Sequence, residues 1–375
     1  MFLALRELRF ARSRFGLMGG VIALISVLMV LLSGLSSGLV EDGVSGLKAT
    51  PVAGFAFNEG TKTDSAFSRS VVTDEQVEAW REQPGVAAAE PFGNMLVNAH
   101  NDKGLPIDLA LFGVPADSFL APDAAVGSGL NAPDGIVISK SALDTGVALG
   151  DIVTIDRLGT ELKVVGVTGG KQTFGHVDVA YVPIDTWREL HAGVRPGEEM
   201  PAQSLTEATA VALHAQPGTT IDYAAGDAAA GTSTVSLEDS FASSPGFSAE
   251  TMTLDLIKVF LYAISALVVG AFFTVWTIQR KHEIAVMRAM GASTGYLLRD
   301  GLAQAFILLL GSVAVGAAVG YGFGSLIGGG VPFLLEPGAV AVAAILLTVL
   351  GLIGAAVAIV RIASVDPLNA LGGQR

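Results

Sequence analysis

Four long stretches of the chain contain no charged residue, and they limit the possible folds more than any other feature. They cover residues 15–40, 259–279, 301–335 and 337–360. An α-helix needs about 20 apolar residues to cross a bilayer, so each stretch except the third matches one span. The third is too long for one helix and too short for two, and Gly328-Gly329-Gly330-Val331-Pro332 predicts where its helix ends. The chain is expected to be a membrane protein with four transmembrane α-helices.

The segment between the first two spans differs in charge from the rest of the chain. Residues 41–255 contain 30 Asp/Glu and 11 Lys/Arg, whereas the remaining residues contain 5 and 11. Such an asymmetry indicates two environments, so we expect a large extracytoplasmic α+β domain between the first and second helices. The expected segments are an interfacial amphipathic helix (1–14), transmembrane helices (15–40, 256–279, 300–327 and 338–361), the outer domain (41–255), a cytoplasmic loop (280–299), a short outer loop (328–337) and a cytoplasmic tail (362–375).

Basic residues near the ends of the spans predict the orientation, because Lys and Arg are enriched on the cytoplasmic side. They occur before the first span, between the second and third, and after the fourth, but not in the short loop between the third and fourth. We therefore expect a multi-pass protein of the bacterial plasma membrane with both termini in the cytoplasm. A cleaved signal peptide is the alternative for the first span, although its apolar run exceeds the usual length of about 7–15 residues.

Within the outer domain the sequence carries both helix and strand signals. Thr73-Asp74-Glu75-Gln76 is a capping-box pattern that predicts a helix ending at Pro84-Gly85. Runs rich in β-branched residues, separated by Gly and Asp, predict strands at 135–138, 151–155, 162–167, 177–182 and 209–214. Residues 218–248 are rich in Ala, Gly, Ser and Thr, which indicates a partly flexible return towards the membrane.

Glycines recur at four-residue spacing in the third span, at Gly316, Gly320, Gly324 and Gly328. This spacing removes side chains from one face of a helix, so another helix can approach closely. We expect helix packing on this face, within the chain or between subunits.

No convincing catalytic or metal-binding motif is present. Gly34-Leu35-Ser36-Ser37-Gly38 matches the nucleophile-elbow pattern G-x-S-x-G by letter, but it lies inside an apolar span and not on a strand-to-helix turn. The chain has no Cys, which excludes disulfides and Cys metal sites, and it lacks both H-E-x-x-H and the P-loop pattern G-x-x-x-x-G-K-[ST]. The four histidines of the expected outer domain lack metal-ligand spacing; they are His100, His176, His191 and His214. We therefore expect no catalytic residue, no metal site, no nucleic-acid partner and no enzymatic activity of the chain itself.

One cytoplasmic segment predicts contact with another protein. Residues 280–293 have the pattern of a short helix that ends at Gly291, a common left-handed residue after a helix. Two methionines on this otherwise charged helix, Met287 and Met290, favour a docking surface. A basic loop beside the membrane is the simpler alternative.

This segment resembles the coupling helix of the FtsX-like, MacB-type ABC transporter permeases, whose pattern is roughly R-x-x-E-I-x-x-[LM]-R-A-[LMI]-G-A-[ST]. The C-terminal Asp366-Pro367-Leu368-Asn369-Ala370-Leu371 is similar to the family's closing P-x-x-A-L element, and the order of segments is similar over the whole chain. The resemblance implies a homodimeric permease in the lipid bilayer, without an intrinsic cofactor, that binds a separate ABC ATPase holding ATP and Mg. It assigns the ATPase contact to Glu283, Ile284, Met287, Arg288, Met290 and Gly291.

The compact form is similar to the haem-efflux permeases of this family, which implies haem as the transported substrate. Haem iron accepts His, Cys, Met, Tyr or a carboxylate, and no Cys exists and no His lies in a span. The candidate haem contacts are Met29 in the first span and Glu250, Met252 and Tyr262 near the start of the second, with Lys258 as partner for a propionate. Ordinary packing of Met29 and exposure of Glu250 to water are the alternatives.

Two other functions stay open at this point. A signalling permease of the FtsX type moves no cargo and activates a cell-wall hydrolase through its outer domain. A MacB-type exporter moves a lipoprotein, peptide or drug.

Overall fold

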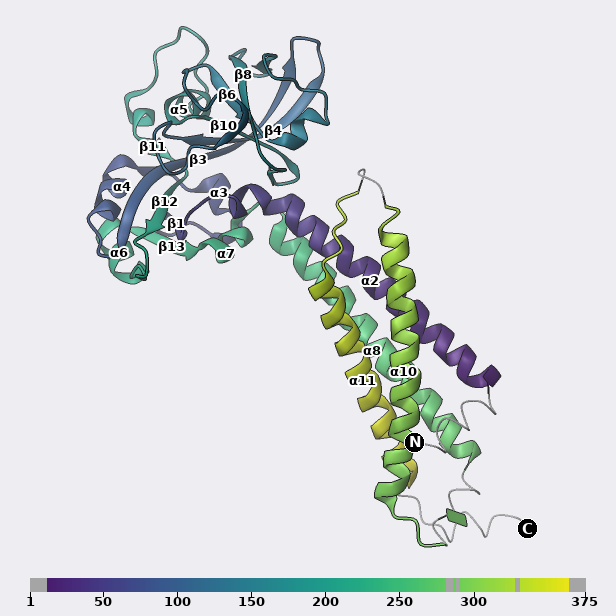
Figure 1. Cartoon of the computed structure of the whole chain (residues 1–375). Coiled ribbons are helices and arrows are strands. Elements are labelled where there is room, and N and C mark those ends of the chain that lie inside the picture. Colours follow the sequence, from purple (N-terminus) through teal and green to yellow (C-terminus); the bar gives the residue numbers. More distant parts are fainter. Residues whose placement is uncertain (1–11, 281–285, 288–289, 328–330, 364–375) are drawn as a thin grey trace. The chain divides into compact units, whose positions relative to one another are not determined.

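The computed structural model describes residues 12–280, 286–287, 290–327 and 331–363, which fall into two compact units (Figure 1). The membrane unit contains the chain up to Gly38 and from Met252 onward, and the outer domain contains Leu39–Thr251. The predicted interfacial helix (1–14) and cytoplasmic tail (362–375) lie almost wholly outside the described residues.

Four helices are long and apolar enough to cross a membrane, as the sequence predicts. They are α2 (Arg12–Lys48), α8 (Phe247–Gln279), α10 (Thr294–Gly324) and α11 (Pro337–Ala363). Helices α2 and α8 extend beyond the predicted spans, by eight residues after Val40 and nine before residue 256. Helix α10 ends at Gly324, a few residues before the predicted glycine break.

The glycine face of α10 packs on α2 within the same chain. A Cβ atom at Gly316 would overlap the carbonyl oxygen of Ala23 and lie 2.6 Å from Cβ of Ser26, and one at Gly320 would lie 2.9 Å from Cβ of Val30. Contacts this short are impossible for any larger residue without a shift of the helices. The predicted packing face is therefore confirmed as an intrachain contact with α2 at Gly316 and Gly320. Gly324 packs on Phe333 instead, and Gly328 lies outside the described residues.

The outer domain is built on a sheet in the order β13-β1-β12-β3-β4-β10-β6-β8-β5, in which β7 also pairs with both β3 and β8 and β9 pairs with β10. Figure 1 shows the strands from β13 to β8 of this order. Its strands are β1 (Gly54–Asn58), β3 (Val86–Asn101), β4 (Pro106–Val114), β5 (Ala124–Gly127), β6 (Gly135–Ile138), β7 (Ile152–Ile155), β8 (Glu161–Thr168), β9 (Thr173–Phe174), β10 (Val177–Pro183), β12 (Ala210–Ala215) and β13 (Thr232–Ser236). A separate pair joins β2 (Val72–Thr73) to β11 (Glu207–Ala208). The helices are α3 (Ala66–Arg69), α4 (Asp74–Arg81), α5 (Ile184–His191), α6 (Tyr223–Ala230) and α7 (Leu237–Ser240).

The long strand β3 joins the two halves of this sheet. Its first part pairs with β12 and its second with β4, with the change of partner between Phe92 and Gly93. The outer end of α2 is part of the domain core, because Val44 and Leu47 are fully buried in the same cluster as Phe112. Helix α2 is therefore anchored in the domain.

The five predicted strands and the capped helix are confirmed. In the capping box of α4 the side chain of Gln76 accepts a hydrogen bond from the Thr73 N–H at 3.0 Å. The prediction of a flexible segment at 218–248 is wrong in part, because this segment contains α6, β13 and α7. Asp222 caps α6, Gly231 ends it in the left-handed conformation, and β13 then pairs with β1.

Candidate functional site

Helices α2 and α8 run antiparallel in the membrane unit, and contacts at both ends set their register. At one end the ring of Phe15 lies 4.7 Å from that of Trp276, and at the other the Lys258 ammonium lies 2.8 Å from the Ser36 hydroxyl. We call the second the outer end, since α2 leaves and α8 enters the membrane unit there. With a rise of about 1.5 Å per residue in both helices, this register places Met29 level with Tyr262–Ser265.

Within the membrane unit, a single cation lies among the described residues of α2 and α8 at the outer end, and it belongs to Lys258. Its ammonium group donates to Ser36 and to a carboxylate oxygen of Asp255 at 3.1 Å. The Lys258 side chain is 23% exposed, whereas that of Asp255 is 70% exposed. A cation inside a bundle needs partners, and the exposed Asp255 is a weak one because water screens the pair. An anionic group can therefore take its place.

The four predicted haem contacts occupy different surroundings. Met29 is buried on α2, and Tyr262 is partly buried beside the core of the membrane unit. Met252 at the start of α8 is 75% exposed. Glu250 belongs to the outer domain, and its carboxylate contacts a histidine there. Only Met29 and Tyr262 lie at matching depth on facing helices.

The histidine beside Glu250 is His176, for which the sequence offers no signal. Its Nε2 lies 3.1 Å from Oε2 of Glu250 and its Nδ1 lies 3.1 Å from Oδ2 of Asp42. Glu250 lies on α8, 74 residues after this histidine, and Asp42 lies on α2, 134 residues before it. Among the described residues, no group of three His, Asp or Glu side chains could hold a metal ion.

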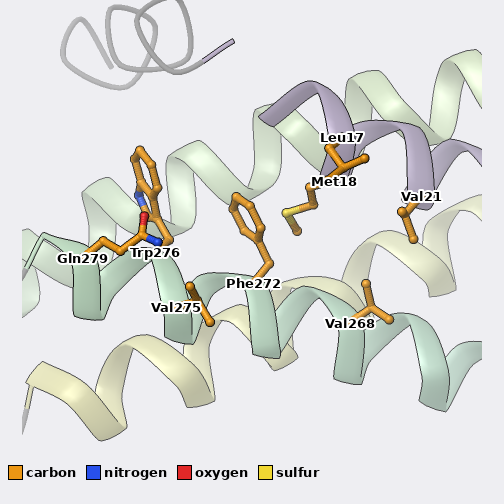
Figure 2. A pocket seen from close by; sticks show the side chains of 8 residues that line it. All are labelled: Leu17, Met18, Val21, Val268, Phe272, Val275, Trp276 and Gln279. Carbon is orange, nitrogen blue, oxygen red and sulfur yellow. The ribbon is translucent and has the colours of Figure 1, made fainter. Parts of the chain in front are cut away.

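A separate apolar cavity of about 410 Å³ lies between α2 and α8 near the Phe15–Trp276 end (Figure 2). Helix α2 contributes Leu17, Met18 and Val21, and α8 contributes Val268, Phe272, Val275, Trp276 and Gln279. None of the four predicted haem contacts lines this cavity, so it is distinct from the region around Lys258.

The described part of the predicted coupling helix ends as the sequence indicates. The N–H of Ala292 donates to the carbonyl oxygen of Met287 at 3.0 Å, and Gly291 has φ of +97°. This is the geometry of a helix closed by a left-handed glycine. Ser293 then caps α10 by accepting from the N–H of Tyr296, so the turn between the two helices is short and hydrogen-bonded.

The docking residues on that helix are only partly described. Met290 is 76% exposed and Met287 is partly buried. Glu283, Ile284 and Arg288 lie outside the described residues.

Two family profiles together match nearly the whole chain. The profile described as MacB-like periplasmic core domain matches residues 15–230, more than half of the chain, and the profile described as FtsX-like permease C-terminal matches residues 256–367.

Two similar proteins align with this chain over nearly their full length. A protein of Staphylococcus haemolyticus, provisionally named hemin transport system permease protein HrtB, is 24% identical over 100% of this chain and 99% of its own. An uncharacterised ABC transporter permease of Mycobacterium tuberculosis is 21% identical with the same coverage. The periplasmic region of MacB from Actinobacillus actinomycetemcomitans is a solved structure with a TM-score of 0.36 and 12% identity, over 50% of this chain and 91% of that one.

The profiles agree with the order of elements in the structure: one apolar helix, a large α+β domain, and three further apolar helices. Permeases of this kind are the membrane components of ABC transporters, and the family implies an ATPase partner. The chain belongs to the family of FtsX-like, MacB-type ABC transporter permeases.

Proposed function

We propose that the chain is the permease of an efflux pump that removes haem from the membrane and thereby relieves haem toxicity. The observation that carries the proposal is the ammonium group of Lys258, held by Ser36 between α2 and α8 at the outer end of the bundle. The full-length similarity to permeases named for hemin transport supports the same cargo.

Haem suits the side chains near Lys258. Its propionates are anionic and can replace the exposed Asp255 at the ammonium group. The apolar ring then extends towards the depth of Tyr262 and Met29, whose phenol and thioether are groups that haem iron accepts. Met252 is exposed one to two turns before Lys258 on α8, where it can contact an arriving haem.

Met29 is buried in the single chain, so its sulfur becomes available only when the helices around it separate. Glu250 is a separate case, because its carboxylate lies in the outer domain beside His176. We therefore place the proposed haem site within the membrane unit and keep Glu250 as a contact at the outer end of α8.

The pump as a whole consists of two copies of this chain and two ATPase subunits, with both termini in the cytoplasm and the outer domain outside. The exposed Met290 and the capped turn at Gly291–Ser293 support ATPase docking at this position, because a short turn with hydrogen-bonded caps can transmit movement to α10. ATP and Mg bind in the partner subunit.

The test is a hemin titration of the full-length chain, purified with its ATPase and followed by the Soret band. Lys258→Gln should weaken hemin binding by about 10- to 100-fold, the range expected when a hydrogen-bonded charge loses its partner. Lys258→Arg keeps the charge and should bind nearly as the wild type does. Lys163→Gln, an exposed lysine of β8, is the matched control.

The proposal is wrong if the wild-type complex shows no saturable Soret change, or if Lys258→Gln binds hemin as the control does. In that case the FtsX-type signalling function and the export of a lipoprotein, peptide or drug are the next to test.

A further inference from the structure

The turn between β9 and β10 connects the two helices that enter the outer domain. His176 is in this turn, and its two ring nitrogens face carboxylates of different helices, Asp42 of α2 and Glu250 of α8, each at 3.1 Å. All three residues belong to the outer domain. One side chain therefore joins the outer end of α2 to the first turn of α8.

The backbone of His176 is held in a conformation that few residues adopt. Its φ is +68°, and it is the only residue other than glycine with a positive φ among the described residues. Such a conformation costs energy and persists where the surroundings hold it, often at functional positions. Here it directs the ring to both carboxylates.

The turn and the residues just before it make further contacts with α2. The N–H of Gly175 donates to the carbonyl oxygen of Gly43 at 2.9 Å, and the N–H of Thr173 donates to the Ser45 hydroxyl at 2.9 Å. Lys171 contacts the second oxygen of Asp42 at 2.6 Å. Helix α2 therefore stays attached to the turn even without the imidazole.

The first turn of α8 contacts the domain through Phe247, which packs against the core cluster that contains Phe174 of β9, and through Glu250. Among the ion pairs of the described residues, Glu250 takes part in one, and its partner is His176. The turn leads directly into β10, which pairs with β4 on one side and β6 on the other near the middle of the sheet. A displacement of the first turn of α8 can therefore be transmitted through His176 to strand β10 of the sheet.

Charged groups from α2, from the segment around β9 and from α8 lie near His176. Burial raises the pKa of Asp178, which accepts a hydrogen bond from Ser141. The charged groups of the cluster are Glu41, Asp42, Lys48, Lys171, Asp178 and Glu250.

We propose that His176 is a positioning residue that ties the first turn of α8 to the last turns of α2 and to the β9–β10 turn, so that these two helix ends move together with the sheet of the outer domain. The inference goes beyond the proposed function and does not depend on the cargo. It bears on transport through α8, which continues from Glu250 to Lys258.

The test measures the distance between α2 and α8 in the full-length chain. Because the chain has no Cys, Ala49→Cys and Ser248→Cys, both exposed, allow nitroxide labelling at two chosen positions. Double electron–electron resonance in lipid nanodiscs then gives the distribution of distances. Dilution of the labelled chain with an unlabelled excess removes signals between subunits.

The wild type should give one narrow distribution, and His176→Asn should broaden it. Asn tolerates a positive φ, so this change removes the ring and spares the backbone; His176→Gly serves the same purpose if the Asn variant does not fold. Glu250→Gln should broaden it as His176→Asn does.

The matched control is His100→Asn. The ring of His100 also contacts a carboxylate, that of Asp156 at 2.6 Å, but this pair lies within the sheet region and touches neither helix. Its distribution should equal that of the wild type. The inference is overturned if His176→Asn keeps the narrow distribution, or if Glu250→Gln does. Neither result involves haem or ATP, so the proposed function stands or falls separately.

Discussion

The ring of Phe333 fills the space that a side chain at Gly34 would need. A Cβ atom at Gly34 would overlap this ring, and one at Gly324 of α10 would lie 2.8 Å from it. The N–H of Leu334 also donates to the carbonyl oxygen of Gly34 at 3.0 Å. Phe333 and Leu334, in the loop between α10 and α11, therefore pack against the face of α2 opposite to Ser36. Near its outer end α2 contacts this loop on one face and Lys258 of α8 on the other.

Replacement of Gly34 should therefore destabilise the membrane unit. Gly34→Leu should cost about 1–3 kcal/mol, the usual range for overpacking, and should lower the melting temperature of the chain in detergent, measured by size-exclusion after heating. The double variant Gly34→Leu/Phe333→Ala should recover part of the loss. Gly20→Leu is the control on the same helix, because a Cβ at Gly20 meets nothing within 4 Å. An equal decrease in melting temperature for Gly20→Leu and Gly34→Leu would contradict the packing of Phe333 against Gly34.

Docking of the ATPase should depend on the exposed face of the coupling helix. Met290→Asp places a charge where we expect apolar contact, and burial of an unpaired charge is costly, so co-purification of the ATPase should fall at least about tenfold. Ser293→Asp adds the same charge three residues later and keeps a capping oxygen for α10. It should retain the ATPase, and a complex that survives Met290→Asp would show that the ATPase docks elsewhere.

The stability of the outer domain should change with pH through Asp151. The ammonium group of Lys103, 3.0 Å away, and the N–H of Ala148 hold the pKa of this carboxyl below its usual value. The charged form is favoured in the folded state, so the contribution is present above the unfolded pKa of about 3.9 and is lost as the pH falls through the lower folded value.

Asp151→Asn should therefore lower the melting temperature of the outer domain at pH 7, and the difference from wild type should vanish in strong acid. Fluorescence of the buried Trp80 and Trp187 reports this domain in the full-length chain. The exposed Asp117→Asn is the control and should melt as the wild type does at every pH. The charge of Asp151 does not stabilise the domain if the melting temperatures of Asp151→Asn and wild type differ by the same amount at pH 7 and in strong acid.

Met29 should affect the spectrum of bound haem more than it affects folding. Met29→Leu conserves volume and should cost less than about 1.5 kcal/mol of stability, but it removes the thioether, so the Soret maximum of the hemin complex should shift. Met18→Leu changes a buried methionine of the same helix that lines the other cavity, and it should leave the spectrum unchanged. Identical spectra for both variants would remove Met29 from the proposed haem site.

The membrane spans were predictable because a long apolar run has few alternatives to a helix across a bilayer. The extension of α2 beyond Val40 and of α8 before residue 256 was not predictable. These residues include charged side chains, which occur in water-exposed helices and in loops alike. Strand β3 gave no period-two signal, because its first half reads Val-Ala-Ala-Ala-Glu-Pro and small residues do not mark the buried face. Pro91 within it also disfavours a strand.

The positions of candidate haem contacts relative to one another were predictable where the residues lie on the same helix, because the helical repeat fixes their spacing. Lys258 and Tyr262 are one turn apart on α8, which the sequence alone indicates. The contact of Glu250 with His176 was not predictable, because it joins residues 74 positions apart through a turn whose histidine has an unusual φ. Long-range contacts of this kind depend on the sheet that places β10 beside the ends of two helices.

The most direct test of the account is ATP-driven loss of haem from proteoliposomes that contain the chain and its ATPase. Haem should leave the membrane only when ATP is hydrolysed, and Lys258→Gln should abolish this loss while the ATPase stays bound. Haem that remains in the membrane during active ATP hydrolysis by the wild-type complex, or leaves it equally well with Lys258→Gln, would contradict the account.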